Sequence, residues 1–132
     1  MRRMPPGIEE SLRGFASRHP NSSLAATISA SPPAMVIAIS GELGHDLAPD
    51  LHATLGSLLP AASSLGGLIL DLGGVSYISS SGIGALTSLL VESKRMKLRL
   101  DLARVTSKAR DVIELLGFAS FFRFIEGYEV EE

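Results

Sequence analysis

Apolar residues along this chain follow two alternating patterns, short continuous runs and helical spacing. Residues 68–72 are a short run with a single aspartate, which is typical of a strand covered on both faces. Further along, Ile83, Leu86 and Leu90 lie three and four positions apart, as one face of a helix requires. The pattern therefore predicts a buried strand followed by a helix that runs to about Met96.

The first half of the chain is predicted to form a hairpin and a helix. Two strand-like runs, residues 24–31 and 35–40, are joined by a short segment with two prolines, which favours an antiparallel hairpin. Asp46 is a candidate N-cap for the next helix, and Pro60 is expected to end it and to begin a loop of small residues up to position 67. One apolar stripe marks the helix: Leu47, Leu51, Leu55 and Leu58.

The second half predicts a strand, a helix and a last strand. Residues 97–102 alternate polar and apolar side chains, which describes a strand with one face in solvent. Thr106 or Ser107 can cap the third helix, and Gly117 can end it. Its predicted buried stripe is Ala109, Val112, Ile113 and Leu116, and residues 121–125 read as the last strand. Because helices alternate with strands, we expect an α/β fold with a mixed, mostly parallel sheet, an N-terminal antiparallel hairpin and helices packed against it.

The two ends of the chain are predicted to lie outside this domain. Residues 1–22 are expected to be an N-terminal extension, in which Ile8, Leu12 and Phe15 form at most two turns of a helix. This extension is either a loose leader or a short docking helix. Residues 23–127 would form the single domain. Residues 128–132 would be an acidic, solvated tail.

Composition excludes several classes of protein. The 132 residues are 45% hydrophobic and carry a net charge of −2, which argues against nucleic acid or an anionic membrane as the main partner. There is no cysteine, and no apolar run approaches the roughly 18 residues that a membrane helix needs. Neither a secretory signal nor a membrane anchor is evident, so the expected location is the cytoplasm.

Three consecutive serines between the predicted strand and helix, Ser79, Ser80 and Ser81, are the main candidate for function. A hydroxyl in the first turn of a helix lies where backbone N–H groups lack partners, so it can cap the helix or carry a phosphate. Thr87 occupies the third glycine position of a dinucleotide loop, and Ser79 breaks the glycine pattern of a hydrolase elbow. No metal-ligand spacing links the three histidines and no carboxylate pair stands out, so we predict no enzyme, no catalytic residue, no metal and no cofactor.

This segment resembles the signature of the STAS family, the anti-sigma factor antagonists. The matching residues are Asp71-Leu72-Gly73-Gly74-Val75 and Ser79-Ser80-Ser81-Gly82-Ile83-Gly84. The resemblance extends over residues 24–125, with Ile39-Ser40-Gly41-Glu42-Leu43 on one side and Leu115-Leu116-Gly117-Phe118 on the other. It implies a single STAS domain, whose mixed sheet agrees with the predicted order of elements.

The resemblance implies partner switching controlled by phosphorylation. Ser81 matches the serine that a partner phosphorylates, with Ser80 as the second choice. In the family that partner is a GHKL-type kinase that also acts as the anti-sigma factor, and a PP2C-type phosphatase removes the phosphate. A monomer or weak homodimer is expected. The expected partner-binding residues are Glu42, His45, Asp46, Ser79, Ser80, Ser81, Gly82, Ile83 and Gly84.

Two departures from the family pattern leave other functions open. Gly44 and Ser79 stand where the family often has aspartates that help to engage the kinase. Their absence favours, as an alternative, a STAS scaffold in a signalling or transport assembly that does not use phosphate. A domain that binds a small ligand or nucleotide at the helix N-terminus is a further alternative. Taken without the resemblance, Ser81 could equally be only a helix cap.

Overall fold

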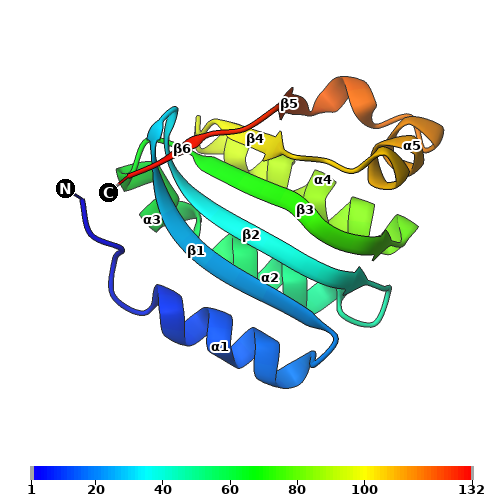
Figure 1. The fold of residues 1–132 in the computed structure, drawn as a ribbon, viewed down its shortest axis with the longest axis horizontal. Coiled ribbons are helices and arrows are strands. Elements are labelled where there is room, and N and C mark those ends of the chain that lie inside the picture. Colours follow the sequence, from blue (N-terminus) through cyan, green and yellow to red (C-terminus); the bar gives the residue numbers. More distant parts are fainter. Residues whose placement is uncertain (1, 132) are drawn as a thin grey trace.

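A computed structural model describes residues 2–131 of the chain, and its elements alternate along the sequence (Figure 1). Their bounds are α1 (Ile8–Arg18), β1 (Ser22–Ser31), β2 (Pro33–Leu43), α2 (Ala48–Ser57), α3 (Leu59–Ser64), β3 (Leu68–Ile78), α4 (Ser80–Arg95), β4 (Leu100–Ala103), α5 (Ser107–Leu115), a 3-10 turn η1 (Ala119–Phe121), β5 (Arg123–Ile125) and β6 (Glu129–Val130).

The strands of the described residues form one mixed sheet of six strands in the order β5-β4-β3-β2-β1-β6. The first two strands are an antiparallel hairpin, whereas β2, β3, β4 and β5 run parallel to one another. Between the parallel strands the chain returns through helices, as parallel pairing requires. The predicted α/β fold, with its mostly parallel sheet and N-terminal hairpin, is confirmed.

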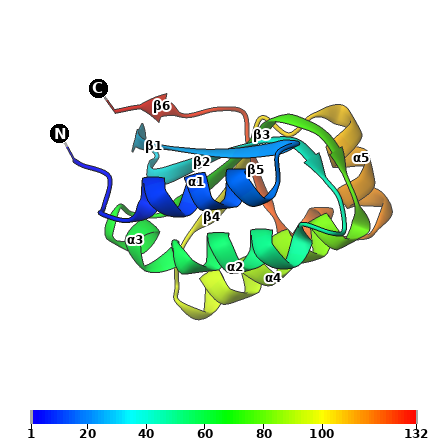
Figure 2. The same cartoon turned by 90° about the horizontal axis from the view of Figure 1, so that it is seen from below.

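The main core lies between the sheet and the helices, and Figure 2 shows α1, α2, α3 and α4 gathered on one side of the sheet. The sheet contributes alternate side chains, such as Met35, Ile37 and Ile39 of β2, each fully buried. The predicted stripe of α2 is confirmed, because Leu47, Leu51, Leu55 and Leu58 are all buried. Residues predicted for one face of α4 are buried as well: Ile83, Leu86 and Leu90.

The N-terminal helix is longer and better packed than the sequence predicted. We expected at most two turns, but α1 has 11 residues. Ile8, Leu12 and Phe15 are buried in the main core, and α1 contacts both β1 and α2. These three side chains can be buried together because they lie four and three positions apart, which places them on a single face of the helix.

Both prolines of the α2–α3 region lie in the first turn of a helix. The helix α2 ends at Ser57, before Pro60 as expected, but the predicted loop is replaced by α3, in whose first turn the missing N–H of Pro60 removes no helical hydrogen bond. Pro49 lies in the first turn of α2. Asp46 was wrongly predicted as the N-cap, because Leu47 occupies that position and no side chain caps the helix.

The C-terminal half differs from its prediction mainly at β4. All four residues of β4 are buried, so the expected solvent face is absent from this strand. Asp101 is fully covered by two arginines, with its carboxylate 3.2 Å from Nε of Arg99 and 3.4 Å from Nε of Arg123. The aliphatic stems of such long side chains cover a sheet face that the alternation alone would leave open. The last strand is also shorter than expected and follows η1.

The ends of α5 follow the sequence closely. Thr106 is the N-cap, and its hydroxyl oxygen accepts a hydrogen bond from the Ala109 N–H at 3.2 Å. Gly117 has φ +80°, which confirms the left-handed residue predicted beyond the helix. Leu116 departs from the predicted stripe, since 39% of it is exposed.

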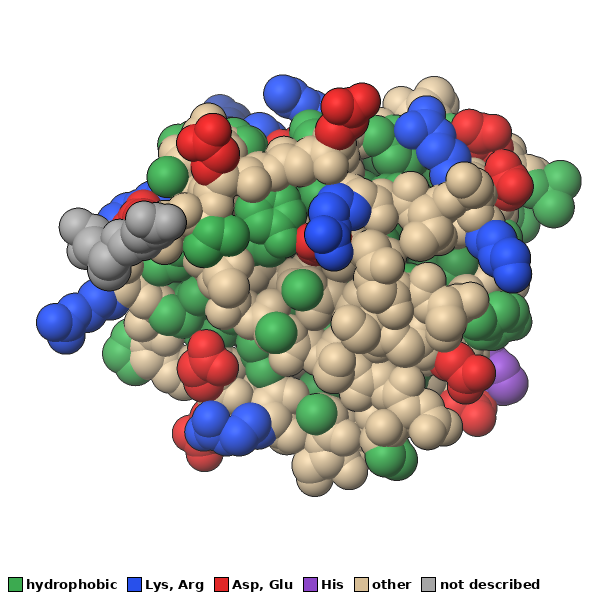
Figure 3. Space-filling view, in the orientation of Figure 1, with side chains coloured by type: hydrophobic (Ala, Val, Ile, Leu, Met, Phe, Trp, Pro, Cys, Tyr) green, Lys and Arg blue, Asp and Glu red, His purple; other side chains and the backbone are tan. Residues whose placement is uncertain are grey.

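The helix-free face of the sheet is mostly uncharged, and Figure 3 views the molecule from this side. A small apolar cluster lies here, formed by Ala34, Val36, Ile69 and Ala103 with Ile125 and Tyr128 packed against it. The buried carboxylate of Asp71 accepts hydrogen bonds from the Tyr128 hydroxyl at 2.6 Å, the Arg104 guanidinium at 3.1 Å and the Gly73 N–H at 2.9 Å. These contacts join the end of the chain to the middle of β3.

Replacing Tyr128 by Phe should weaken the fold in a pH-dependent way. Burial, followed by the hydrogen bond to Asp71, raises the pKa of Tyr128 to about 12. Because the folded-state pKa is raised, the stabilisation is complete below about pH 10 and is lost as pH rises towards 12. We expect Tyr128→Phe to lose about 1–3 kcal/mol at pH 8, since it leaves a buried acceptor without its donor. Urea unfolding at pH 8 and 11.5 measures this, and an equal loss at both pH values would contradict the assignment.

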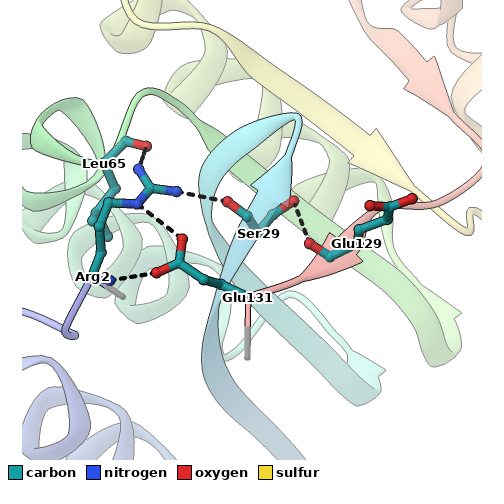
Figure 4. Close-up of polar contacts among 5 residues, drawn as sticks. All are labelled: Arg2, Ser29, Leu65, Glu129 and Glu131. Carbon is teal, nitrogen blue, oxygen red and sulfur yellow. Dashed lines mark hydrogen bonds and ion pairs between the residues drawn. The ribbon is translucent and has the colours of Figure 1, made fainter.

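The two chain ends are joined by one network of hydrogen bonds (Figure 4). The Arg2 guanidinium donates to the carbonyl of Leu65 at 2.6 Å and to that of Ser29 at 2.8 Å, and it pairs with Glu131 at 3.1 Å. The backbone N–H of Arg2 also donates to Glu131. Within the predicted acidic tail, Glu129 and Val130 form β6 beside β1 with exposed side chains, and Glu131 is ion-paired with Arg2.

Candidate functional site

The serine turn lies where β3 ends and α4 begins, and Ser79 is its capping residue. The Ser79 backbone is extended, with φ −83° and ψ 166°, and its hydroxyl oxygen accepts a hydrogen bond from the Gly82 N–H at 3.0 Å. The Ile83 N–H donates to the Ser79 carbonyl at 3.0 Å. Ser79 therefore satisfies the start of the helix, and the capping alternative for Ser81 is corrected.

Ser81 is exposed in the first turn of α4, and Ser80 is exposed beside it. Within residues 2–131, no hydrogen bond involves the hydroxyl of either residue. The first turn of α4 contains no acidic side chain, and the partial positive charge of a helix N-terminus favours an added anion. The hydroxyl of Ser81 is thus free to react or to contact another molecule.

The loop of residues 41–46, which consists of the end of β2 and the turn after it, lies directly beside the serine turn. Glu42 pairs with Tyr77 and Leu43 with Ile78 across the parallel β2–β3 ladder. The Ser79 N–H then donates to the Leu43 carbonyl at 2.9 Å, which joins the loop to the cap of α4. The predicted residues of this loop, Glu42, His45 and Asp46, are all exposed, and Nε2 of His45 lies 3.0 Å from a carboxylate oxygen of Asp46.

Two predicted contact residues are not part of the exposed surface. Ile83 is fully buried in the core, and Gly82 is buried as well. A Cβ at Gly82 would lie 3.0 Å from both the Ile78 side chain and the Leu43 carbonyl, so glycine permits the close packing of α4 on the strand ends. Gly84 is half-buried, and a Cβ there would meet nothing within 4 Å.

A groove between α2 and α4 contains Ser81. Within residues 2–131, the groove is lined by His45, Ala48, Pro49, His52, Ser81, Gly84, Ala85 and Ser88. His52 lies across the groove from α4 and contacts it, with Nε2 2.9 Å from a carboxylate oxygen of Glu92. His52 was not among the site residues predicted from the sequence. Its spacing of seven residues from His45, which would place both on one side of a continuous helix, is the signal that could have found it.

Tyr77 is another exposed residue that the sequence analysis did not select. It is 55% exposed and lies next to Glu42 in the β2–β3 register. Together with the loop and the α1–β1 turn it borders a second hollow, whose other lining residues include Arg18, Asn21 and Asp46. An exposed aromatic ring beside an exposed carboxylate is common at protein interfaces.

The helix that follows the loop is anchored by α1. The Arg18 guanidinium donates two hydrogen bonds to Asp50, of 2.7 and 3.1 Å, and the ring Nε2 of His19 lies 2.7 Å from the same carboxylate. Arg18 chiefly, with help from His19, lowers the pKa of Asp50 against the opposing effect of burial. Asp50 thus stays ionised and fixes α2 relative to the N-terminal helix.

Among residues 2–131, no group of three or more acidic, histidine or cysteine side chains is arranged to hold a metal ion. Over the same residues, no helix has the length and apolar character needed to cross a bilayer.

A family model described as "Mlab, STAS domain" matches residues 26–125. The chain belongs to the STAS family. The match begins within β1 and ends with β5, so α1 and β6 lie outside the matched residues. The search of curated proteins gives no match.

Solved structures share the fold at low sequence identity. The unphosphorylated anti-sigma factor antagonist SpoIIAA has a TM-score of 0.62 at 18% identity, over 78% of this chain and 88% of that one. An anti-sigma factor antagonist from Mycobacterium paratuberculosis has a TM-score of 0.63 at 22% identity, covering 80% and 86%. A sulfate transporter family protein from Wolinella succinogenes has a TM-score of 0.56 at 20% identity, covering 69% and 75%.

The different roles of the serines in this STAS domain lead to a stability prediction. Ser79→Ala should lower the free energy of unfolding by about 1 kcal/mol, because the Gly82 N–H loses its acceptor. Ser81→Ala is the matched control and should change it by less than about 0.5 kcal/mol, because its hydroxyl is exposed. Urea unfolding of both variants measures the difference. Equal losses would mean that Ser79 is not the cap.

Proposed function

We propose that this STAS domain is an anti-sigma factor antagonist that works by partner switching, with Ser81 as the phosphorylated residue. The observation that carries the proposal is the position of Ser81, exposed in the first turn of α4 while Ser79 caps that helix. A serine that the fold does not need can change its charge without loss of the fold. Ser80 is the second candidate, since it is exposed in the same turn.

The partner surface would combine the loop and the exposed part of the serine turn. It consists of Glu42, His45, Asp46, Ser79, Ser80, Ser81 and Gly84, and we add Tyr77, which the β2–β3 register places beside Glu42. The hydrogen bond from the Ser79 N–H to the Leu43 carbonyl supports a single surface, because it holds the two segments together. Gly82 and Ile83 are buried and would contribute indirectly, by shaping the first turn of α4.

The proposed partner is a GHKL-type serine kinase that is also an anti-sigma factor, and a PP2C-type phosphatase would reverse the modification, in the cytoplasm. A phosphate adds nearly two negative charges at a site where Glu42 and Asp46 already contribute carboxylates. At an interface these charges must be desolvated or face like charge. A loss of about 2.7 kcal/mol would weaken the complex a hundredfold.

A direct experiment uses the purified chain, the cognate kinase and ATP. We expect one phosphate per chain, retained in Ser80→Ala and abolished in Ser81→Ala, as measured by mass spectrometry of the serine peptide. Ser81→Asp should weaken kinase binding at least about a hundredfold by calorimetry while the melting temperature is kept. Ser63→Asp, at an exposed position of α3, is the matched charge control and should bind normally. Phosphorylation of Ser81→Ala, or normal binding by Ser81→Asp, would refute the proposal.

A second candidate function is a STAS scaffold in a transport or signalling assembly that does not use phosphate. It is favoured by the glycine at position 44, where an aspartate is common in the family, and by the similarity in fold to a sulfate transporter family protein. A scaffold would bind its partner equally well as Ser81→Ala and Ser81→Asp. The affinity series above therefore separates the two functions.

A further inference from the structure

We propose that a phosphate on Ser81 is bound within the chain itself, by His45 and His52 across the groove between α2 and α4. The inference rests on the proposed function only for the origin of the phosphate. It concerns where the modified side chain lies and which groups receive it.

The groove has the right charge for an anion. Among the described residues that line it, only His45 and His52 can ionise, and both become cations. The other lining residues are small or uncharged, and no carboxylate borders the groove directly. A phosphate on Ser81 would thus share the lining of the groove with two potential cations, while the carboxylates of Asp46 and Glu92 contact the same two rings from outside that lining.

Both histidine rings are already held by one nitrogen. Nε2 of His45 lies 3.0 Å from Asp46, and Nε2 of His52 lies 2.9 Å from Glu92. Since a protonated imidazole donates from both nitrogens, each ring can keep its carboxylate and offer Nδ1–H to the phosphate. Asp50, the carboxylate within α2, is paired with Arg18 of α1 and with His19 that follows it. Lys94 and Arg95 lie at the opposite end of α4.

Some N–H groups at the start of α4 already donate hydrogen bonds and cannot bind the phosphate. The Gly82 N–H donates to the Ser79 hydroxyl and the Ile83 N–H to the Ser79 carbonyl. Side chains that line the groove can add donors to those N–H groups of the first turn that remain. The groove provides room towards the histidines, because its volume is about 310 Å³ and a Cβ at Gly84 would meet nothing within 4 Å.

Binding in the groove would change the partner surface beyond the added charge. His45 belongs to the loop of residues 41–46, His52 belongs to α2, and Ser81 belongs to α4. A phosphate bound to both rings would link these three segments. The exposed side chain of His45, which already borders the groove, would be held by the phosphate and would restrain the loop. The partner would then meet a changed loop as well as a phosphate.

The test installs phosphoserine at position 81 by genetic encoding, so that no kinase is needed. A phosphorus NMR titration follows the second ionisation of the phosphate, which for a free phosphoserine lies near pH 6. Because nearby cations favour the dianion, we expect the midpoint to lie at least about 0.5 unit below that of the His45→Gln/His52→Gln double variant. Phosphoserine at position 63 is the matched exposed control and should titrate like the double variant. Amide exchange of residues 41–52 should slow in the protein phosphorylated at Ser81.

Equal midpoints in all three proteins, with unchanged exchange, would overturn the inference. His45→Gln alone provides a second variant if the double variant is destabilised. Its phosphate midpoint should lie between those of the protein with both histidines and the double variant. The result is independent of the proposed function. A kinase that ignores Ser81 would leave the titration unchanged, and a phosphate that titrates freely would leave phosphorylation of Ser81 by the kinase intact.

Discussion

Replacing Phe15 by Ala should destabilise the protein by about 3–5 kcal/mol, a large part of the stability of a domain of this size. The ring of Phe15 is fully buried and lies 4.6 Å from the ring of His19, centroid to centroid. Deleting it leaves a cavity between α1, β1 and α2 and loosens the segment that holds Asp50. Urea unfolding followed by circular dichroism measures the loss.

Arg13→Ala is the control for Phe15, because Arg13 is exposed on the same helix and alanine favours a helix equally well. It should change the free energy of unfolding by less than about 0.5 kcal/mol. If Phe15→Ala had an equally small effect, α1 would be an appendage, and residues 1–22 would form the separate extension that the sequence predicts. The boundary between extension and domain stays a prediction that this pair of variants tests.

Gly41→Ala should cost at least about 2–4 kcal/mol and should also disturb the partner surface. Gly41 has φ +96°, and a Cβ there would lie 2.1 Å from the carbonyl oxygen of Asn21. The backbone must therefore shift, and with it the hydrogen bonds that hold Glu42 to Asn21 and Ser22. We expect a lower urea midpoint together with weaker kinase binding.

Gly44→Ala is the matched control for Gly41, three positions along the same loop. A Cβ at Gly44 meets nothing within 4 Å, so the variant should keep its stability within about 0.5 kcal/mol. Equal stability of the two variants would show that the tight contact between the loop and the α1–β1 turn is not required by the fold.

Local sequence patterns predicted those elements whose burial depends on a single face. The leucines from Leu47 to Leu58 and the apolar residues of α4 are buried as their spacing requires. Thr106 and Gly117 delimit α5 because capping chemistry acts within a few residues. The order of these elements was enough to predict the mixed sheet, because two parallel strands must be joined by a crossover connection.

Features that depend on distant residues escaped the sequence analysis. Asp101 looked like a solvent-facing position, but Arg99 and Arg123 cover it, and Arg123 lies 22 positions further along the chain. Similarly, α1 is stabilised by contacts with β1 and α2, which its own composition does not reveal. Tertiary packing overrides a weak local preference in both cases.

The functional site was predicted in outline and corrected in detail. The family signature located the serine turn, and the pairing of β2 with β3 explains why the loop of residues 41–46 lies beside it. Three consecutive serines offer the same hydroxyl at three positions, so the sequence could not show which one caps α4. The helix begins at Ser80, and this start assigns the cap to Ser79 and leaves Ser81 exposed.

The clasp between Arg2 and Glu131 places both ends of the chain at one side of the molecule, away from the arrowheads of β2 and β3 that lead into the loop and the serine turn (Figure 1). A surface tether or a fluorescent tag at either end should therefore leave the serine turn accessible in a biosensor. Two dyes, one at each end, would transfer energy efficiently while the clasp is closed. Their separation would report its opening on unfolding.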